Sequence, residues 1–90
     1  MVSDTMGYAL AGLGRLDEAI ASYSAAAEGM RSLGRRRDTA DCLIALAETQ
    51  DRAGQGGAAR VSWTEALEML EALDDPEADD VRRTLAARNG

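Results

Sequence analysis

The chain contains few side chains that could carry out chemistry. It has no histidine and a single cysteine, Cys42, so no imidazole is available to activate that thiol. One cysteine also leaves no basis for a disulfide framework or a cysteine-based metal site. We therefore predict that Cys42 is a small apolar filler or a half-buried residue, with a reactive thiol as the remote alternative.

Carboxylates and glycines also occur in short clusters. The carboxylate pairs are Asp17–Glu18, Glu65–Glu68 and Asp74–Asp75. Adjacent residues on a helix point apart, the i,i+3 pair is expected on a solvent-exposed face, and calcium-loop spacing is absent. The segment 54–57 has three glycines, but it is too short for a phosphate-binding loop and follows no predicted strand. We predict no enzymatic activity, no bound metal and no cofactor.

The charge of the chain indicates which partners are disfavoured. Its formal net charge is −6, and all ten of its basic residues are arginines. This balance opposes binding to nucleic acids and to anionic membranes. The run Arg35–Arg37 is predicted to be a solvated turn, with a phosphate or acidic-partner site as the alternative. A nucleic-acid adaptor using this run with Arg31 and Arg52 is disfavoured by the overall charge.

The composition favours an all-α fold of good helix formers, with few, scattered β-branched residues. Apolar residues at helical spacing, with glycines or an Asp-Asp-Pro signal between them, predict five helices. These cover about residues 2–12, 15–33, 36–52, 58–73 and 76–87. The start, Met1–Asp4, has no basic region and no long apolar run, so we expect neither a signal peptide nor a membrane span. A soluble cytoplasmic protein is the expectation.

A repeat organises these helices. Gly14, Ala19 and Tyr23 recur at a fixed offset of 40 as Gly54, Ala59 and Trp63. The echo continues through Ala26 and Ala66, then Leu33 and Leu73. A fixed period of this size is typical of stacked helical repeats. We predict that Tyr23 and Trp63 fill the core, where small residues let the helices approach closely. The predicted core also includes Leu33 and Leu73.

The repeat resembles the tetratricopeptide repeat, whose pattern is W-x2-L-G-x2-Y, A-x3-F and P. The first copy has Ser3, Met6, Gly7 and Leu10, then Ala19 and Tyr23; the second has Leu43, Leu46, Ala47 and Gln50, then Ala59 and Trp63. Both copies lack the final proline, with Arg31 and Glu71 in its place, and the period is 40 where the usual one is 34. The resemblance implies a right-handed stack of antiparallel helix pairs. One domain, residues 1–90, would comprise repeat one (3–34), repeat two (36–73) and a capping helix (76–88).

The resemblance also implies a protein-interaction module, because stacked repeats present a concave face lined by the first helix of each repeat. The lysines and asparagines of the family's carboxylate clamp are absent. An acidic groove for a basic or amphipathic segment is therefore expected, with a solvated face as the alternative. The positions carried over to this chain are Asp4, Tyr8, Ala11, Ile44, Glu48 and Asp51.

Two repeats are fewer than a stable stack usually needs. The chain is therefore expected either to be part of a larger protein or to complete itself with another chain. The first reading is an interaction arm similar to those of large bacterial signalling and transcriptional regulators. The alternative is a structural domain that self-associates as a homodimer.

Overall fold

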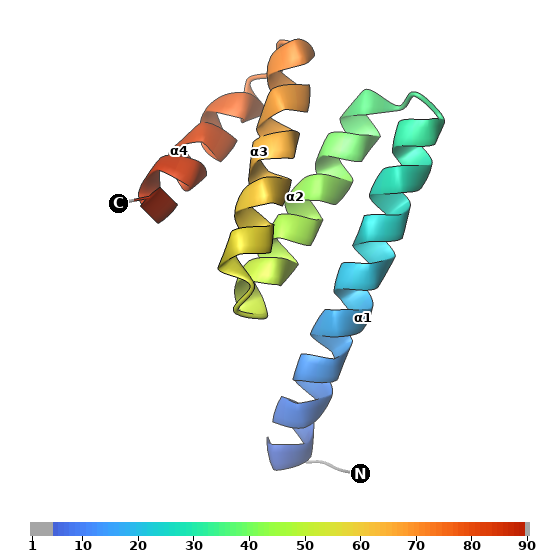
Figure 1. The fold of residues 1–90 in the computed structure, drawn as a ribbon, viewed down its shortest axis with the longest axis vertical. Coiled ribbons are helices and arrows are strands. Elements are labelled where there is room, and N and C mark those ends of the chain that lie inside the picture. Colours follow the sequence, from blue (N-terminus) through green and yellow to red (C-terminus); the bar gives the residue numbers. More distant parts are fainter. Residues whose placement is uncertain (1–4, 90) are drawn as a thin grey trace.

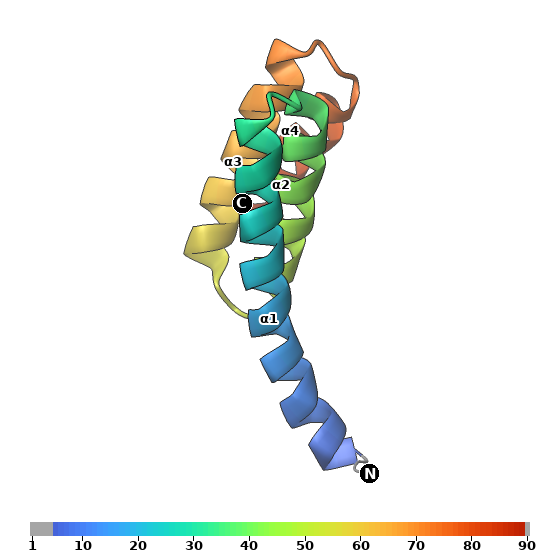
Figure 2. The same ribbon diagram turned by 90° about the vertical axis from the view of Figure 1, so that its right-hand side faces the viewer.

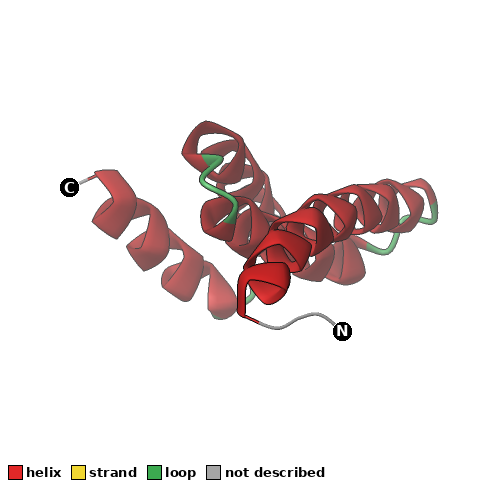
Figure 3. Ribbon diagram, turned by 90° about the horizontal axis from the view of Figure 1, so that it is seen from below, coloured by secondary structure: helices red, strands yellow, loops and turns green. Residues whose placement is uncertain are grey.

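Four α-helices form the part of the chain that the structure describes. The computed structural model describes residues 5–89, with side chains described for 15–88. The helices are α1 (Thr5–Ser32), α2 (Arg36–Arg52), α3 (Gly56–Ala72) and α4 (Glu77–Asn89), and no strand occurs among these residues. Each helix packs against the next in the chain and reverses its direction (Figure 1). Seen from below, α2 and α3 lie between α1 and α4 (Figure 3). The all-α prediction is confirmed for the described residues.

The three turns between the helices share one construction. Gly34, Gly54 and Asp74 are equally spaced along the chain and have positive φ angles of 74°, 78° and 57°. In each turn, the N–H of the next residue donates to the carbonyl five positions earlier, at 2.8–2.9 Å. This left-handed helix ending suits glycine, and aspartate is among the few other residues that tolerate it. The chain therefore reverses direction at regular intervals.

The prediction of five helices is wrong. A turn was expected at Gly12–Gly14, but α1 continues through both residues as one helix of 28 residues. Glycine in a helix costs about 1 kcal/mol relative to alanine, which a continuous helix can tolerate. A turn would also break helical hydrogen bonds, and only packing of the preceding segment would offset that loss. The N-terminal part of α1 instead projects beyond the α2–α3 turn (Figure 2).

The core lies on both sides of α2. One cluster joins α2, α3 and α4 around Trp63 and Leu70, which are buried together with Ala78 and Val81. The second joins α1 to α2 and α3 through Ala27, Leu43, Leu46 and Ala66. The alanines allow close helix approach, while Trp63 and Leu70 fill the larger spaces. The predicted core position of Trp63 is confirmed.

Three other residues predicted to be core are exposed. Tyr23, Leu33 and Leu73 keep exposed fractions of 38%, 68% and 37%. Leu33 and Leu73 are the last residues before the positive-φ turns, where no neighbouring helix covers them. Tyr23 belongs to neither core cluster, although it lies one helical turn before the buried Ala27, and α2 is the described helix that packs along α1.

The start of α4 follows its sequence signal. The backbone N–H of Glu77 donates to Asp75 Oδ1 at 2.9 Å, so Asp75 caps the helix and Pro76 follows it. The apolar stripe predicted for this helix packs inward: Ala78 and Val81 are buried and Leu85 is partly buried. By contrast, α3 begins at Gly56, earlier than the predicted start at Ala58.

Candidate functional site

One face of α2 carries residues at alternating intervals of four and three. These intervals place side chains on one line along a helix. The line consists of Arg37, Asp41, Ile44, Glu48 and Asp51. It contains all three site residues predicted for the second repeat.

At the N-terminal end of α2, this line of residues is bonded to the start of α4. Arg37 Nη1 donates to Asp75 Oδ2, and Arg37 Nη2 donates to Glu77 Oε1 at 2.8 Å. Arg37 Nε also lies 3.3 Å from Asp41 Oδ1. The pKa of the Asp75 carboxyl is below its ordinary value, chiefly because the N–H of Glu77 donates to it. Desolvation raises this pKa, and the Arg37 guanidinium lowers it further. One arginine thus links the first turns of α2 and α4.

At the C-terminal end of α2, the line is bonded to the last turn of α4. Arg88 Nη1 donates to Asp51 Oδ1, and Arg88 Nη2 donates to the carbonyl oxygen of Gly56 at 2.8 Å. The other oxygen of Asp51 accepts a hydrogen bond of 3.0 Å from Trp63 Nε1. Both carboxylate oxygens of Asp51 are therefore used within the chain. They position Arg88 and satisfy the indole of a core residue.

These two links show how α2 and α4 are related. Both helices run in the same direction, because each end of α2 bonds to the corresponding end of α4 (Figure 1). Their backbones do not pack directly, and α3 supplies the shared core between them. Parallel helices separated by an antiparallel one are typical of the first helices of successive helix pairs.

We use the term α2–α4 face for the surface between the two links. It consists of Asp41, Ile44 and Glu48 from α2 and Thr84 from α4. Asp41 and Glu48 are exposed, whereas Ile44 and Thr84 are half-buried. Ile44 packs against both core clusters, so its side chain also supports the fold. The face therefore combines exposed carboxylates with a partly covered apolar residue.

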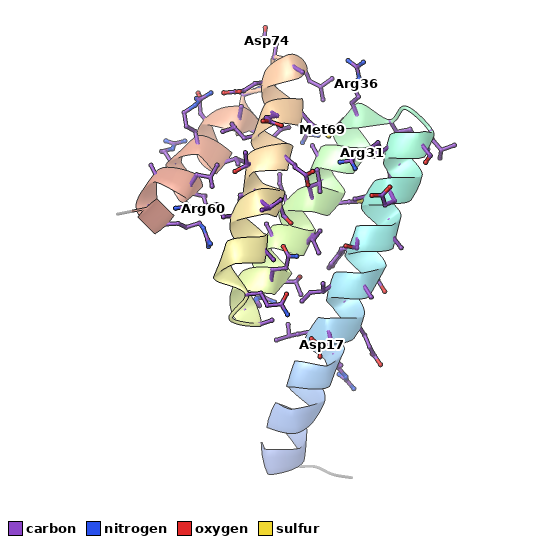
Figure 4. All side chains as sticks on the ribbon, in the orientation of Figure 1. Asp17, Arg31, Arg36, Arg60, Met69 and Asp74 are labelled. Atoms are coloured by element: carbon purple, nitrogen blue, oxygen red, sulfur yellow. The ribbon has the colours of Figure 1, made fainter. Side chains whose placement is uncertain are left out.

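The site residues predicted for the first repeat lie elsewhere in the chain. Asp4 lies outside the described residues. Tyr8 and Ala11 fall within the backbone of α1, but their side chains lie outside the described part. That stretch of backbone belongs to the projecting end of α1, beyond Asp17, which Figure 4 places near the level of the α2–α3 turn. In the described structure, α4 is the helix linked to the Ile44, Glu48 and Asp51 line.

Sequence reasoning missed the residues that join the two helices. Arg37 was interpreted only as part of a charge run, and neither Thr84 nor Arg88 was considered for the site. The signal was the spacing on each helix, since Glu77, Thr84 and Arg88 also recur at helical intervals. The run Arg35–Arg37 is exposed, as predicted, and Arg36 points away from the helices (Figure 4). The predicted turn is wrong for Arg36 and Arg37, which belong to the first turn of α2, and Arg37 pairs with α4.

Among the described side chains, Cys42 and the carboxylates were also considered as possible centres for chemistry. Cys42 is half-buried, and burial, followed by the nearby Asp38 and Asp41, raises the pKa of its thiol. That thiol stays protonated at neutral pH and is a weak nucleophile. Within residues 5–89, His, Cys, Asp and Glu side chains form no group of three or more suited to a metal ion.

The outer side of α4 has an open hollow lined by Asp79, Arg82, Arg83 and Ala86. Its arginines are paired: Arg82 bonds to Asp79 and Glu71, each at 2.6 Å, and Arg83 bonds to Asp80. The hollow therefore offers no cluster of unpaired basic groups. Its lining also comes from a single helix, which makes it a weaker candidate than the α2–α4 face.

None of the described helices is both long and apolar enough to cross a bilayer. Comparison with curated proteins and with solved structures gives no significant match. The family profile described as Tetratricopeptide repeat matches residues 2–72, which include α2, α3 and most of the correspondence between the two copies of the repeat. The antiparallel helix pairs and the parallel arrangement of α2 and α4 agree with this match. The chain belongs to the tetratricopeptide-repeat family.

Proposed function

We propose that the chain is a protein-interaction module that binds a basic or amphipathic segment of a partner on its α2–α4 face. Repeats of this family generally mediate contacts between proteins, and the first helices of successive repeats line their concave surface. Here the two links hold α2 and α4 parallel, with Glu48 and Asp41 exposed between them. That preorganised pair of helices is the observation that carries the proposal.

The charges on this face determine the expected partner. Glu48, which makes no ion pair among the described residues, favours lysine or arginine on the partner. Asp41 adds negative charge beside it but is already paired with Arg37, and Ile44 favours an apolar residue between them. Asp51 contributes indirectly, because its carboxylate positions Arg88 at the edge of the face. A helix with an apolar stripe and flanking basic residues satisfies both requirements. A larger bacterial regulator carrying this chain as an arm is the wider setting that we propose.

The test is titration of the chain with a fluorescent amphipathic helical peptide that carries lysines beside its apolar stripe. Glu48→Lys should weaken binding about fivefold or more, equivalent to about 1 kcal/mol from one exposed charge pair and the new repulsion. Glu68→Lys is the matched control, since it makes the same charge change at an exposed position of α3. Equal affinity of both variants and the unmodified chain would remove the α2–α4 face from the proposal. Ile44→Ala is less suitable, because Ile44 supports the core.

A second candidate function is self-association into a homodimer. The observation that favours it is the side of α1 that carries Tyr23, which is 38% exposed and belongs to neither core cluster. Light scattering over a range of concentrations tests this candidate, and a chain that stays monomeric at millimolar concentration would contradict it.

A further inference from the structure

The two long helices at corresponding positions of the repeat differ in how they are covered. On α3, one face is buried by neighbouring helices, and it consists of Ala59, Trp63, Ala66 and Leu70. One repeat earlier, the corresponding face of α1 consists of Ala19, Tyr23, Ala26 and Met30. Every residue of this second set is half-buried or exposed, and Tyr23 is 38% exposed where Trp63 is 6% exposed. One copy of the same apolar surface is covered and the other is open.

The α3 face shows which helix covers such a surface. The preceding helix, α2, folds back at Gly54 and packs along α3, with a buried hydrogen bond of 2.7 Å from Ser62 Oγ to Gln50 Oε1. Residues 3–12 lie 40 positions before residues 43–52 of α2, so the repeat predicts that they cover α1. Met6 and Leu10 of this segment, with Leu13 after it, have the apolar spacing that such a role needs.

Residues 5–12 of that segment cannot cover their own α1 in the structure, because they belong to the same continuous helix. Gly14 precedes Gly34 by the same interval that separates Gly34 from Gly54, yet the chain is helical at Gly14. Residues 5–13 therefore continue the helix of α1 and extend beyond the other helices (Figure 2). The position expected to form a turn acts as a straight connection.

We propose that residues 5–12 of one copy cover the open α1 face of a second copy, so that two chains exchange these segments. The pairing is reciprocal about a two-fold axis, because each copy has one projecting segment and one open face. Gln50 of α2 contacts Ser62 of α3, and these residues correspond to Leu10 and Ser22 one repeat earlier. The same register therefore places Leu10 of one copy beside Ser22 of the other. The segment from the second chain thus takes the position on α1 that α2 takes on α3. This proposal rests on the self-association candidate and specifies its interface.

Substitutions at the connection test the exchange. Gly14→Ala favours the continuous helix and disfavours a positive φ, so it should tighten dimerisation about tenfold, with two connections per dimer. Leu16→Pro should have the opposite effect. In the turn before α4, Pro76 lies two residues after Asp74 and directly before the first residue of the helix. Leu16 has the corresponding position, two residues after Gly14. Proline at position 16 breaks the continuous helix and suits the folded-back turn. Leu16→Ala is the control, since it removes the side chain but permits the helix.

Sedimentation equilibrium from low micromolar to millimolar concentration, with circular dichroism to confirm folding, is the measurement. We expect dimers for the unmodified chain and Leu16→Ala, tighter dimers for Gly14→Ala, and folded monomers for Leu16→Pro. Tyr23→Asp should weaken the dimer at least tenfold, whereas Ser24→Asp, at the neighbouring exposed position, should not.

Two results would overturn the proposal. A Leu16→Pro variant that dimerises as well as the unmodified chain would reject the exchange and leave self-association through another surface. Monomers for both the unmodified chain and Gly14→Ala would reject the exchange and self-association together.

Discussion

Two arginine–carboxylate links, each made by only a few side chains, determine the relation between α2 and α4. Arg37 joins the first turns of the helices, and Arg88 joins their last turns through Asp51. Exposed ion pairs usually contribute little to stability, often less than about 1 kcal/mol. Their main effect here is orientation, since each guanidinium bonds to two groups and so fixes a direction. The geometry of the candidate face therefore depends on single residues.

Replacing Asp51 tests the link at the end of α4. Asp51→Asn keeps an acceptor for Trp63 but removes the charge opposite Arg88, so it should lower the free energy of unfolding by about 1 kcal/mol. Asp51→Ala also leaves the indole N–H without its partner and should cost about 1–3 kcal/mol more. Urea denaturation measures both changes. Asp80→Asn, which affects only the exposed pair with Arg83, is the control and should cost about 0.5 kcal/mol or less. Equal losses for all three variants would contradict this account of Asp51.

The lowered pKa of Asp75 predicts how the stability of the chain depends on pH. Its pKa is lower in the folded chain than in the unfolded chain, so the folded state holds this proton less tightly. The resulting stability is present above about pH 4, the ordinary range of an aspartate, and is lost as the pH falls through the lower folded pKa. Asp75→Asn should therefore reduce the fall in urea midpoint between neutral and strongly acidic pH. Asp74→Asn is the control, because asparagine also tolerates the positive φ at that position. The account of Asp75 fails if both variants follow the same pH curve.

At the scale of helices, the repeat places similar residues in different surroundings. Trp63 packs between helices, whereas Tyr23 at the same repeat position is partly exposed. The difference comes from the neighbouring helices and not from the residue type. A substitution at each position therefore measures how well its helix is covered.

The paired substitutions are Trp63→Ala and Tyr23→Ala. Trp63→Ala should lower the free energy of unfolding by about 3–5 kcal/mol, because it leaves a cavity and removes the hydrogen bond to Asp51. Tyr23→Ala should cost about 1 kcal/mol or less under dilute, monomeric conditions. Thermal and urea denaturation of both variants give the comparison. Similar losses at the two positions would mean that the α1 and α3 faces are equally covered.

The helices were largely predictable from the sequence because local signals agree. Gly34, Gly54 and the Asp75–Pro76 pair end or begin helices at the expected places, and the apolar stripe of α4 packs inward. Gly14 carries the same signal, but glycine permits a turn without requiring one. Whether it forms depends on contacts between distant segments, which local periodicity does not contain.

The candidate face was predictable only in part, for a related reason. The α2 residues Ile44, Glu48 and Asp51 follow from the helical spacing of one repeat. Their neighbours on α4 do not, because the links depend on the reach of long arginine side chains across two helices. The helical spacing of Glu77, Thr84 and Arg88 marks one side of α4, but it does not show which helix that side meets. The direction of Arg37 and Arg88 became clear only from the structure.

As a whole molecule, the chain has two surfaces that differ in character. The α2–α4 face is held from both ends and carries exposed carboxylates, which suits a basic partner segment. The open face of α1 is more apolar and suits a further helix. The two surfaces lie on different helices, so the proposed partner binding and the proposed self-association do not compete for the same residues. Variants at Glu48 and Tyr23 should therefore affect the two processes independently.

The central claim is that a partner segment binds along α2 and α4. The most direct measurement is an NMR titration of the isotope-labelled chain with the basic amphipathic peptide, following each backbone amide. The account predicts that the largest shifts occur in residues 41–48 of α2 and 80–88 of α4, and that Glu48→Lys reduces them. Shifts confined to α1, or to the exposed side of α3 around Val61 and Glu68, would contradict it.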